Sequence, residues 1–217
     1  RSTLLASSAA SDVYKRQRYN NMIIKKITSK QDGLKLEIAI MECENPKGIV
    51  QFSHGMAEHK ERYFDFMQYL NDRGYICVIH DHRGHGSSVK SKNDYGYFYT
   101  ENADYIVDDL FQVTEYVQDT YPGLEVTLFS HSMGTLVARC YLKKYDAHIR
   151  RLILCGPPTE NSAASLGLAL AKIIKPFYKE KKGNGLLNKM AFAGYETENR
   201  WLSKNPENVD RYEADEL

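Results

Sequence analysis

The feature that most constrains the fold is a series of four short apolar runs, each followed by a loop. The runs are 48–53, 75–79, 126–129 and 152–155, and segments with helical periodicity separate them. This pattern predicts an α/β protein in which four parallel strands form a sheet covered by helices on both faces. Functional residues of such sheets lie at the C-terminal ends of the strands, so the loops there are the places to search.

Other segments complete the predicted elements. Apolar and polar residues alternate over 23–28 and again over 34–41, on either side of a Gln-Asp-Gly turn. This alternation is typical of a β-hairpin. Apolar residues at helical spacing predict helices over 62–71 and 104–120, the second ending just before a Pro-Gly pair.

The segment 126–145 changes period in its middle, from a strand-like run to helical spacing. Ser130-His131-Ser132-Met133-Gly134 lies at the change. A serine on such a turn exposes its hydroxyl beside the free N–H groups that begin the helix, as in the nucleophile elbow G-x-S-x-G. Ser130 stands in place of the first glycine, so the motif is incomplete. Taken alone, the pattern also fits an ordinary N-cap serine.

Two other loops are expected beside Ser132 at the same edge of the sheet. One is His54-Gly55-Met56, after the first apolar run, and the other is 80–88, after the second. Acyl transfer needs two backbone N–H groups aimed at the developing oxyanion, and Met56 and Met133 hold the positions that supply them in this arrangement. Gly55 would let the backbone approach closely, although a plain turn glycine is the alternative.

Five short motifs follow one another along the chain. They are Phe-Ser-His-Gly-Met-Ala-Glu-His-Lys-Glu-Arg-Tyr (52–63), Asp-His-Arg-Gly-His-Gly-Ser-Ser (81–88), Gly-Tyr-Phe (96–98), Tyr-Pro-Gly-Leu (121–124) and Phe-Ser-His-Ser-Met-Gly (129–134). Together they resemble the α/β-hydrolases of the monoacylglycerol lipase and lysophospholipase group, often filed under the serine aminopeptidase name. The resemblance runs from about Met22 to the last residue and implies an α/β-hydrolase fold.

The resemblance also implies a function. Ser132 would be the nucleophile of an acyl-enzyme mechanism on carboxylic esters of single-chain lipids, such as monoacylglycerols or lysophospholipids. Met56 and Met133 would supply the oxyanion N–H groups, and no cofactor is expected. The residues expected to support them are His54, Gly55, His131 and Gly134. A peptidase or non-lipid esterase of the same fold is an alternative, and so is a non-catalytic module that holds an apolar ligand.

The histidine-rich segment 80–85 allows a rival interpretation. Its spacing resembles the H-x-H-x-D-H metal motif of the metallo-β-lactamase group, in which three imidazoles could hold Zn²⁺. Gly84 occupies the place of the aspartate, and the segment matches the hydrolase motif without gaps. We therefore expect no metal here, and we expect Asp81 and Arg83 to brace the loop by hydrogen bonds.

The catalytic base expected in this fold is missing from the chain. The triad follows the order Ser, then Asp or Glu, then His, and the only histidine after Ser132 is His148. A helix over 132–145 would separate the two by roughly 20 Å, so His148 is out of reach. The side chain of His131 should diverge from Ser132 on a sharp turn, so we expect His131 to be structural.

We therefore expect a fragment, nearly inactive by itself, whose catalytic acid and base lie beyond Leu217. Asp210 and Asp215 lie in a polar, helical tail, and neither is expected to be the acid. The predicted domains are a disordered or non-native leader (1–21), a hydrolase core (22–158) and an incomplete helical cap (159–217).

The cap is predicted to contain two helices, over 164–178 and 201–213. A cap of this kind would close over the serine and form an apolar channel for an acyl chain. The first helix carries lysines along its edge, so it could rest on a lipid surface, or its polar side could simply be solvated.

Bulk properties exclude several classes of protein. A formal charge of +1 without a long basic block argues against a nucleic-acid partner. No apolar run approaches the roughly 20 residues that span a bilayer. Cys43, Cys77, Cys140 and Cys155 are widely spaced and are predicted to be buried thiols in a reducing compartment. These features predict a cytoplasmic protein whose membrane contact, if any, is peripheral and made by the cap.

Overall fold

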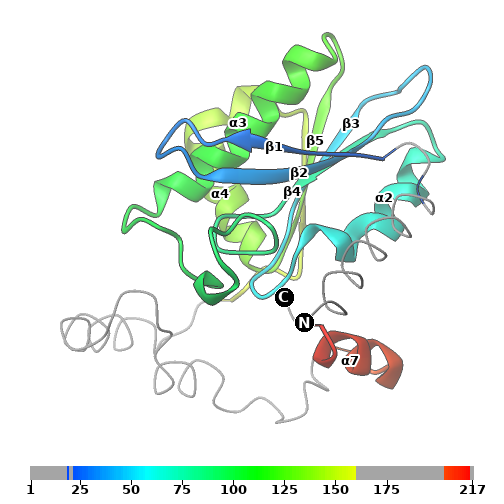
Figure 1. Cartoon of the computed structure of the whole chain (residues 1–217). Helices are drawn as coiled ribbons and strands as arrows, with labels where there is room; N and C mark the ends of the chain where they lie inside the picture. The colour runs from blue at the N-terminus through cyan, green and yellow to red at the C-terminus, as the bar shows by residue number, and fades with distance from the viewer. Residues whose placement is uncertain (1–18, 20–21, 160–202, 216–217) are drawn as a thin grey trace, which may run out of the picture.

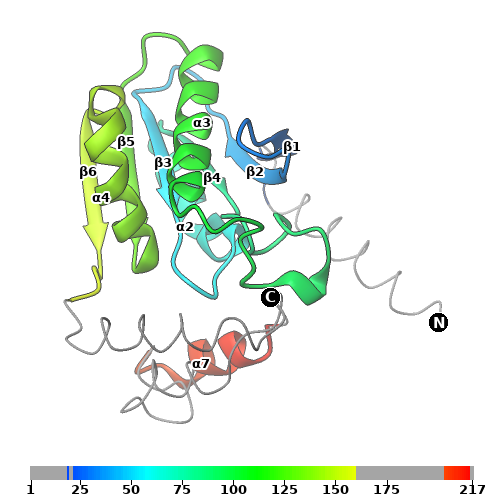
Figure 2. The ribbon, with the colours of Figure 1, turned by 90° about the vertical axis from the view of Figure 1, so that its left-hand side faces the viewer.

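The computed structural model describes residues 19, 22–159 and 203–215, which form a six-stranded sheet with helices on both faces (Figures 1 and 2). The strands are β1 (Met22–Thr28), β2 (Lys35–Met41), β3 (Ile49–Ser53), β4 (Ile76–His80), β5 (Val126–His131) and β6 (Arg151–Cys155). The helices are α2 (Phe64–Asn71), α3 (Asp104–Thr120), α4 (Met133–Tyr145) and α7 (Pro206–Glu213), with short 3-10 helices η1 (Lys60–Tyr63), η2 (Lys92–Asp94) and η3 (Asp146–His148).

The strand order in the sheet is β1-β2-β4-β3-β5-β6. β3, β4, β5 and β6 run parallel, whereas β1 and β2 form an antiparallel hairpin joined antiparallel to β4. The predicted hairpin, the four parallel strands and the helices on both faces are therefore confirmed. The helix predicted over 62–71 is split, because 60–63 forms a 3-10 turn before α2 begins.

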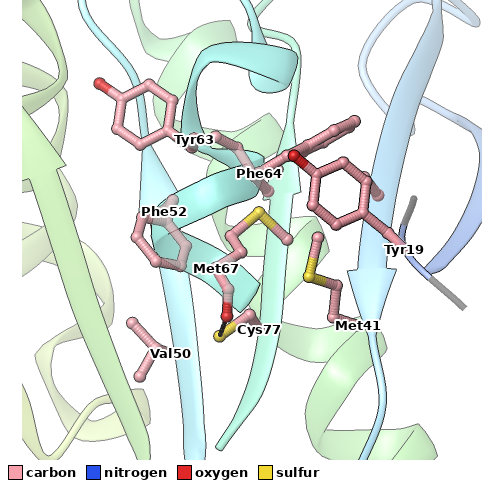
Figure 3. Close-up of a cluster of buried hydrophobic side chains, with 10 residues drawn as sticks. Tyr19, Met41, Val50, Phe52, Tyr63, Phe64, Met67 and Cys77 are labelled. Atoms are coloured by element: carbon pink, nitrogen blue, oxygen red, sulfur yellow. Dashed lines mark hydrogen bonds between the residues drawn. The ribbon is translucent and has the colours of Figure 1, made fainter. Parts of the chain in front are cut away.

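The hydrophobic core has two layers, one on each face of the sheet. On one face, Phe64 and Met67 of α2 pack on Val50, Phe52 and residues of neighbouring strands (Figure 3). On the other face α3 and α4 cover the sheet (Figure 2). The two layers follow from the alternation of side chains along each strand, which sends successive residues to opposite faces.

β6 lies at the edge of the sheet formed by the described residues, and most of its side chains are exposed. Ile153 is 47% exposed and Leu154 is 38% exposed. The apolar run that predicted a fully buried strand therefore gave the strand correctly and its burial wrongly. Burial depends on what covers the strand, and a strand's own sequence does not contain that information.

The prediction of four buried cysteines is wrong for two of them. Cys77 is buried and Cys43 is half-buried, but Cys140 and Cys155 are exposed, and all four are free thiols. Cys140 lies on the side of α4 that faces away from the sheet, and Cys155 ends the exposed strand β6. A thiol within an apolar run is buried only if its own position faces the core.

Some predictions concern residues outside the described part of the chain. These are the leader except Tyr19, the helix over 164–178 and most of the predicted cap. α7 lies within the helix predicted over 201–213 and is found beyond the carboxyl edge of the parallel strands (Figures 1 and 2). Within the described ranges, no helix has both the length and the apolar character that crossing a bilayer would require.

Candidate active site

Ser132 occupies the tight turn between β5 and α4. Its backbone has φ 48° and ψ −119°, a conformation that is strained for any residue with a side chain. The side chain makes no capping hydrogen bond to the helix, and the residue is half-buried. The N-cap interpretation is therefore wrong, because the hydroxyl is not used to satisfy the N–H groups of α4. Strain of this kind is typical of functional sites.

Gly134 and Ser130 let this turn pack closely on β3 and β6. A Cβ placed on Gly134 would lie 2.2 Å from the carbonyl oxygen of Ser53, so no other residue fits there. Ser130 is fully buried, and its hydroxyl donates to the carbonyl of Ile153 at 3.1 Å. The serine that departs from the G-x-S-x-G pattern is thus accommodated by a hydrogen bond to the neighbouring strand.

The loop after β3 lies directly beside Ser132. A Cβ added to Gly55 would be 3.1 Å from Cβ of Ser132, which is tighter than most Cβ contacts, so a glycine at this position favours the close approach of the loop to the serine. Met56 follows, with its side chain 55% exposed. Ala57 has φ 54° in the left-handed region. On the other side, Met133 begins α4 and packs partly against the core.

Glu58 ties this loop together, a role that the sequence analysis missed. Its Oε2 accepts the N–H of Gly55 at 2.7 Å and the hydroxyl of Tyr63 at 2.9 Å. Its Oε1 lies 3.9 Å from Nε2 of His131, which is half-buried at the end of β5. The available signal was spacing, since an acidic side chain three residues after a turn can reach back to a backbone N–H, as in a capping box.

Four buried histidines pack ring on ring beneath the loop. The ring centroids of His54 and His82 are 4.4 Å apart, those of His80 and His82 are 4.6 Å apart, and those of His54 and His85 are 5.3 Å apart. Nδ1–H of His54 donates to the carbonyl of Gly55 at 2.7 Å, while its Nε2 accepts the N–H of His82 at 2.9 Å. One nitrogen donates and the other accepts, so the ring of His54 is neutral.

The surroundings keep this cluster uncharged. Burial, reinforced by neighbouring histidines, lowers the pKa of His54 and of His82 well below the ordinary value. Burial, with Arg83 nearby, lowers the pKa of His80 to about 3. Across the described ranges, no three His, Cys, Asp or Glu side chains are grouped so that they could hold a metal ion. The rings serve as packing and hydrogen-bonding groups under the turn.

Two buried ion-pair groups brace the loop after β4, as predicted for Asp81 and Arg83. Asp81 accepts the backbone N–H and the ammonium of Lys60, both at 2.8 Å. Nε of Arg83 donates to Asp109 at 2.8 Å, and its Nη1 donates to Asp32 at 2.9 Å. Both cations are fully buried, so these pairs fix the loop by contacts that water cannot replace.

No histidine among the described residues hydrogen-bonds the Ser132 hydroxyl. His148 lies in η3, at the far end of α4, where its Nδ1 pairs with Gln118 at 3.1 Å. Asp210 is exposed on α7. Asp215 accepts Nη2–H of Arg62 at 2.8 Å and is also bound to His59. Neither aspartate has a hydrogen bond to Ser132 among the described contacts.

Comparisons with known proteins give a consistent picture. The family described as serine aminopeptidase, S33, matches residues 44–217. The human monoglyceride lipase is 29% identical over 175 residues, which cover 79% of this chain and 52% of that protein. The monoacylglycerol lipase of Mycolicibacterium smegmatis is 27% identical, covering 80% and 57%. The chain spans about half the length of the curated relatives it matches.

Solved structures agree on the fold. A thermostable carboxyl esterase from Bacillus coagulans, solved in complex with glycerol, superposes with a TM-score of 0.79 at 26% identity. The match covers 89% of this chain and 65% of the esterase.

Proposed function

Because the chain belongs to the serine aminopeptidase, S33, family of α/β-hydrolases, we propose that it forms the nucleophile-bearing part of a serine hydrolase. The proposed substrates are carboxylic esters of single-chain lipids, such as monoacylglycerols or lysophospholipids. The monoacylglycerol lipases among its relatives support this substrate class. The proposed division is a hydrolase core over 22–158 and part of a cap over 159–217.

The observation that carries the proposal is the strained turn at Ser132 with Gly55 packed against it. The hydroxyl oxygen of Ser132 would attack the ester carbonyl carbon, and the N–H groups of Met56 and Met133 would hold the oxyanion. The alcohol would leave with a proton from a general acid, and water would then release the fatty acid from the acyl-enzyme. We propose that the histidine base and its carboxylate partner follow Leu217 in the whole protein.

Substitution of the serine tests the proposal in the whole protein. Ser132→Ala should lower kcat on a monoacylglycerol by a factor of about 10³ or more, because the residual activity comes only from binding and the oxyanion site. Ser91→Ala, at an exposed serine that caps η2 on the surface, is the matched control and should keep wild-type kcat. Unchanged turnover in Ser132→Ala would refute the assignment.

A second candidate is favoured by one observation, namely that no described histidine hydrogen-bonds the Ser132 hydroxyl. A chain without a base could hold an apolar ligand and not cleave it. The 217-residue chain should hydrolyse a chromogenic short-chain ester hardly at all, whereas the whole protein should hydrolyse it rapidly. If the whole protein binds fatty-acid analogues yet leaves the ester intact, the binding function is correct. Turnover by the 217 residues alone that is lost in Ser132→Ala would show that the base lies within them.

A further inference from the structure

The loop between β3 and η1 contains a turn that is closed by a hydrogen bond from a side chain to the backbone. Glu58 lies three residues after Gly55, and its Oε2 accepts the Gly55 N–H at 2.7 Å. The turn residues Met56 and Ala57 lie between the two ends of this contact. The side chain of Glu58 thereby closes a ring around the backbone segment that, under the proposed function, supplies one oxyanion N–H.

A second donor fixes the same carboxylate oxygen from the core side. The hydroxyl of Tyr63 donates to Oε2 of Glu58 at 2.9 Å. Tyr63 is buried in the core layer under α2, with its ring 5.9 Å from that of Phe52 (Figure 3). Burial and the adjacent carboxylate both raise the pKa of Tyr63, so its hydroxyl stays protonated and remains a donor. The carboxylate is therefore anchored to the rigid core.

The turn requires such an anchor because it is strained. Ala57 has φ 54°, in the left-handed region that is unfavourable for a residue with a Cβ. Gly55 sits where an added Cβ would be 2.9 Å from Oε2 of Glu58 and 3.1 Å from Cβ of Ser132. A small relaxation of the turn would move its N–H groups relative to the serine.

We propose that Glu58 is a positioning residue, whose carboxylate, held by Tyr63, fixes the 55–57 turn so that the Met56 N–H stays aimed beside Ser132. This inference rests on the proposed function. The role is that of a hydrogen-bond acceptor and not that of a charge. The nearest ring nitrogen of His131 is 3.9 Å from Oε1, beyond hydrogen-bond distance, whereas both donors share Oε2.

Three variants of the whole protein separate these roles. Glu58→Ala should lower kcat on a monoacylglycerol about 10- to 100-fold with little change in KM, since a displaced oxyanion donor acts in the transition state. Its affinity for an alkyl boronic acid, which forms a tetrahedral adduct with the serine, should fall by a similar factor. Glu58→Gln should stay within a few-fold of wild type, because one amide oxygen can accept both donors. Tyr63→Phe, which keeps the ring, should fall between them.

The controls make the result decisive. Glu44→Ala removes an exposed carboxylate outside the loop and should leave kcat, KM and boronic acid affinity unchanged. Wild-type kcat in Glu58→Ala, or a Glu58→Gln variant as impaired as Glu58→Ala, would overturn the inference. If Glu58→Ala does not fold, wild-type kcat and boronic acid affinity in Tyr63→Phe would overturn it instead. Ser132→Ala measured in parallel distinguishes the two proposals, because retained activity there refutes the function and not merely the role of Glu58.

Discussion

The four clustered histidines and His59 are all buried near the same loop, yet the clustered rings are neutral and the ring of His59 is protonated. His54 and His82 have their pKa lowered well below the ordinary value by burial and by neighbouring imidazoles. Burial also opposes the charged form of His59, but hydrogen bonds to Glu61 and Asp215 outweigh it and raise the pKa. Burial alone therefore does not decide the charge of a histidine; its partners do.

The partners differ in what they can accept. Nδ1 of His59 lies 2.6 Å from Glu61 and its Nε2 lies 2.8 Å from Asp215, so each ring nitrogen must donate an N–H to a carboxylate. Only the protonated ring can supply both. In the cluster, each ring meets backbone groups, a serine hydroxyl or other imidazoles, and a neutral ring satisfies these contacts. One loop therefore carries both a neutral packing group and a charged link.

The largest expected effect is the loss of stability in acid that the neutral histidine cluster causes. Below about pH 6.5 the unfolded imidazoles take up protons while the folded cluster stays neutral down to its lowered pKa, about 3 for His80. The cluster's contribution is thus complete above pH 6.5 and is lost as the pH falls. His54, His80 and His82, whose pKa values are lowered most, should together cost about 4 kcal/mol of unfolding free energy per pH unit. Urea unfolding between pH 7.5 and 5 measures the slope.

The variant His80→Phe measures the contribution of one histidine to this pH dependence of the unfolding free energy. Neither ring nitrogen of His80 has a hydrogen-bond partner among the described residues, so the phenyl ring removes unpaired polar atoms from the core. The slope should decrease by about 1.4 kcal/mol per pH unit relative to wild type. Equal slopes in the two proteins would show that His80 does not stay neutral on folding.

Lys60, like His59, is a buried cation held by carboxylates, and its substitution tests how much such carboxylates contribute. Its buried ammonium contacts Glu37, Glu61 and Asp81 at 2.8–2.9 Å. Burial would lower the pKa of Lys60, but these carboxylates hold it above its usual range. Lys60→Met leaves buried carboxylates without their cation and should cost about 3–5 kcal/mol of unfolding free energy in urea.

The matched control is a surface lysine. Nζ of Lys30 lies 2.8 Å from Glu115, and both side chains are well exposed, so Lys30→Met should cost no more than about 1 kcal/mol. Loss of the Lys60 cation should also raise the pKa of His59. Glu61 contacts both Lys60 and His59, so without Lys60 its negative charge would be shared with His59 only. A histidine titration followed by NMR would detect this. Equal costs for the two lysine variants would contradict the structure's assignment of burial.

The sequence predicted the elements that depend on local pattern. Apolar runs gave the parallel strands, and the change of period at 126–145 placed Ser132 on a strand-to-helix turn. The convergence of the loops after β3 and β5 followed from a rule about parallel sheets, and Gly55 packed against Ser132 agrees with it. These features need no knowledge of distant contacts.

The features that escaped prediction depend on partners far apart in the sequence. Lys60 lies in the motif 52–63 and gives no sign of burial, because its partners Glu37 and Asp81 come from other loops and strands. Glu58 was visible in the motif, but its role depends on where Tyr63 points. Cys155 lies in an apolar run, yet whether it is buried depends on what covers β6.

The smallest expected effect is the coupling free energy between His59 and Asp215, which tests directly whether His59 is charged. A double-mutant cycle with His59→Gln and Asp215→Asn should give a coupling of about 1 kcal/mol near pH 6. Because folding raises the pKa of His59, the coupling is fully present below about pH 6.5 and disappears as the pH rises through the folded value. Hydrogen exchange across 203–215 should accelerate over the same range, since Asp215 then keeps Arg62 but loses the charged imidazole. A coupling of equal size at pH 6 and pH 9 would mean that His59 is neutral in the folded protein, and the contrast with the four clustered histidines would vanish.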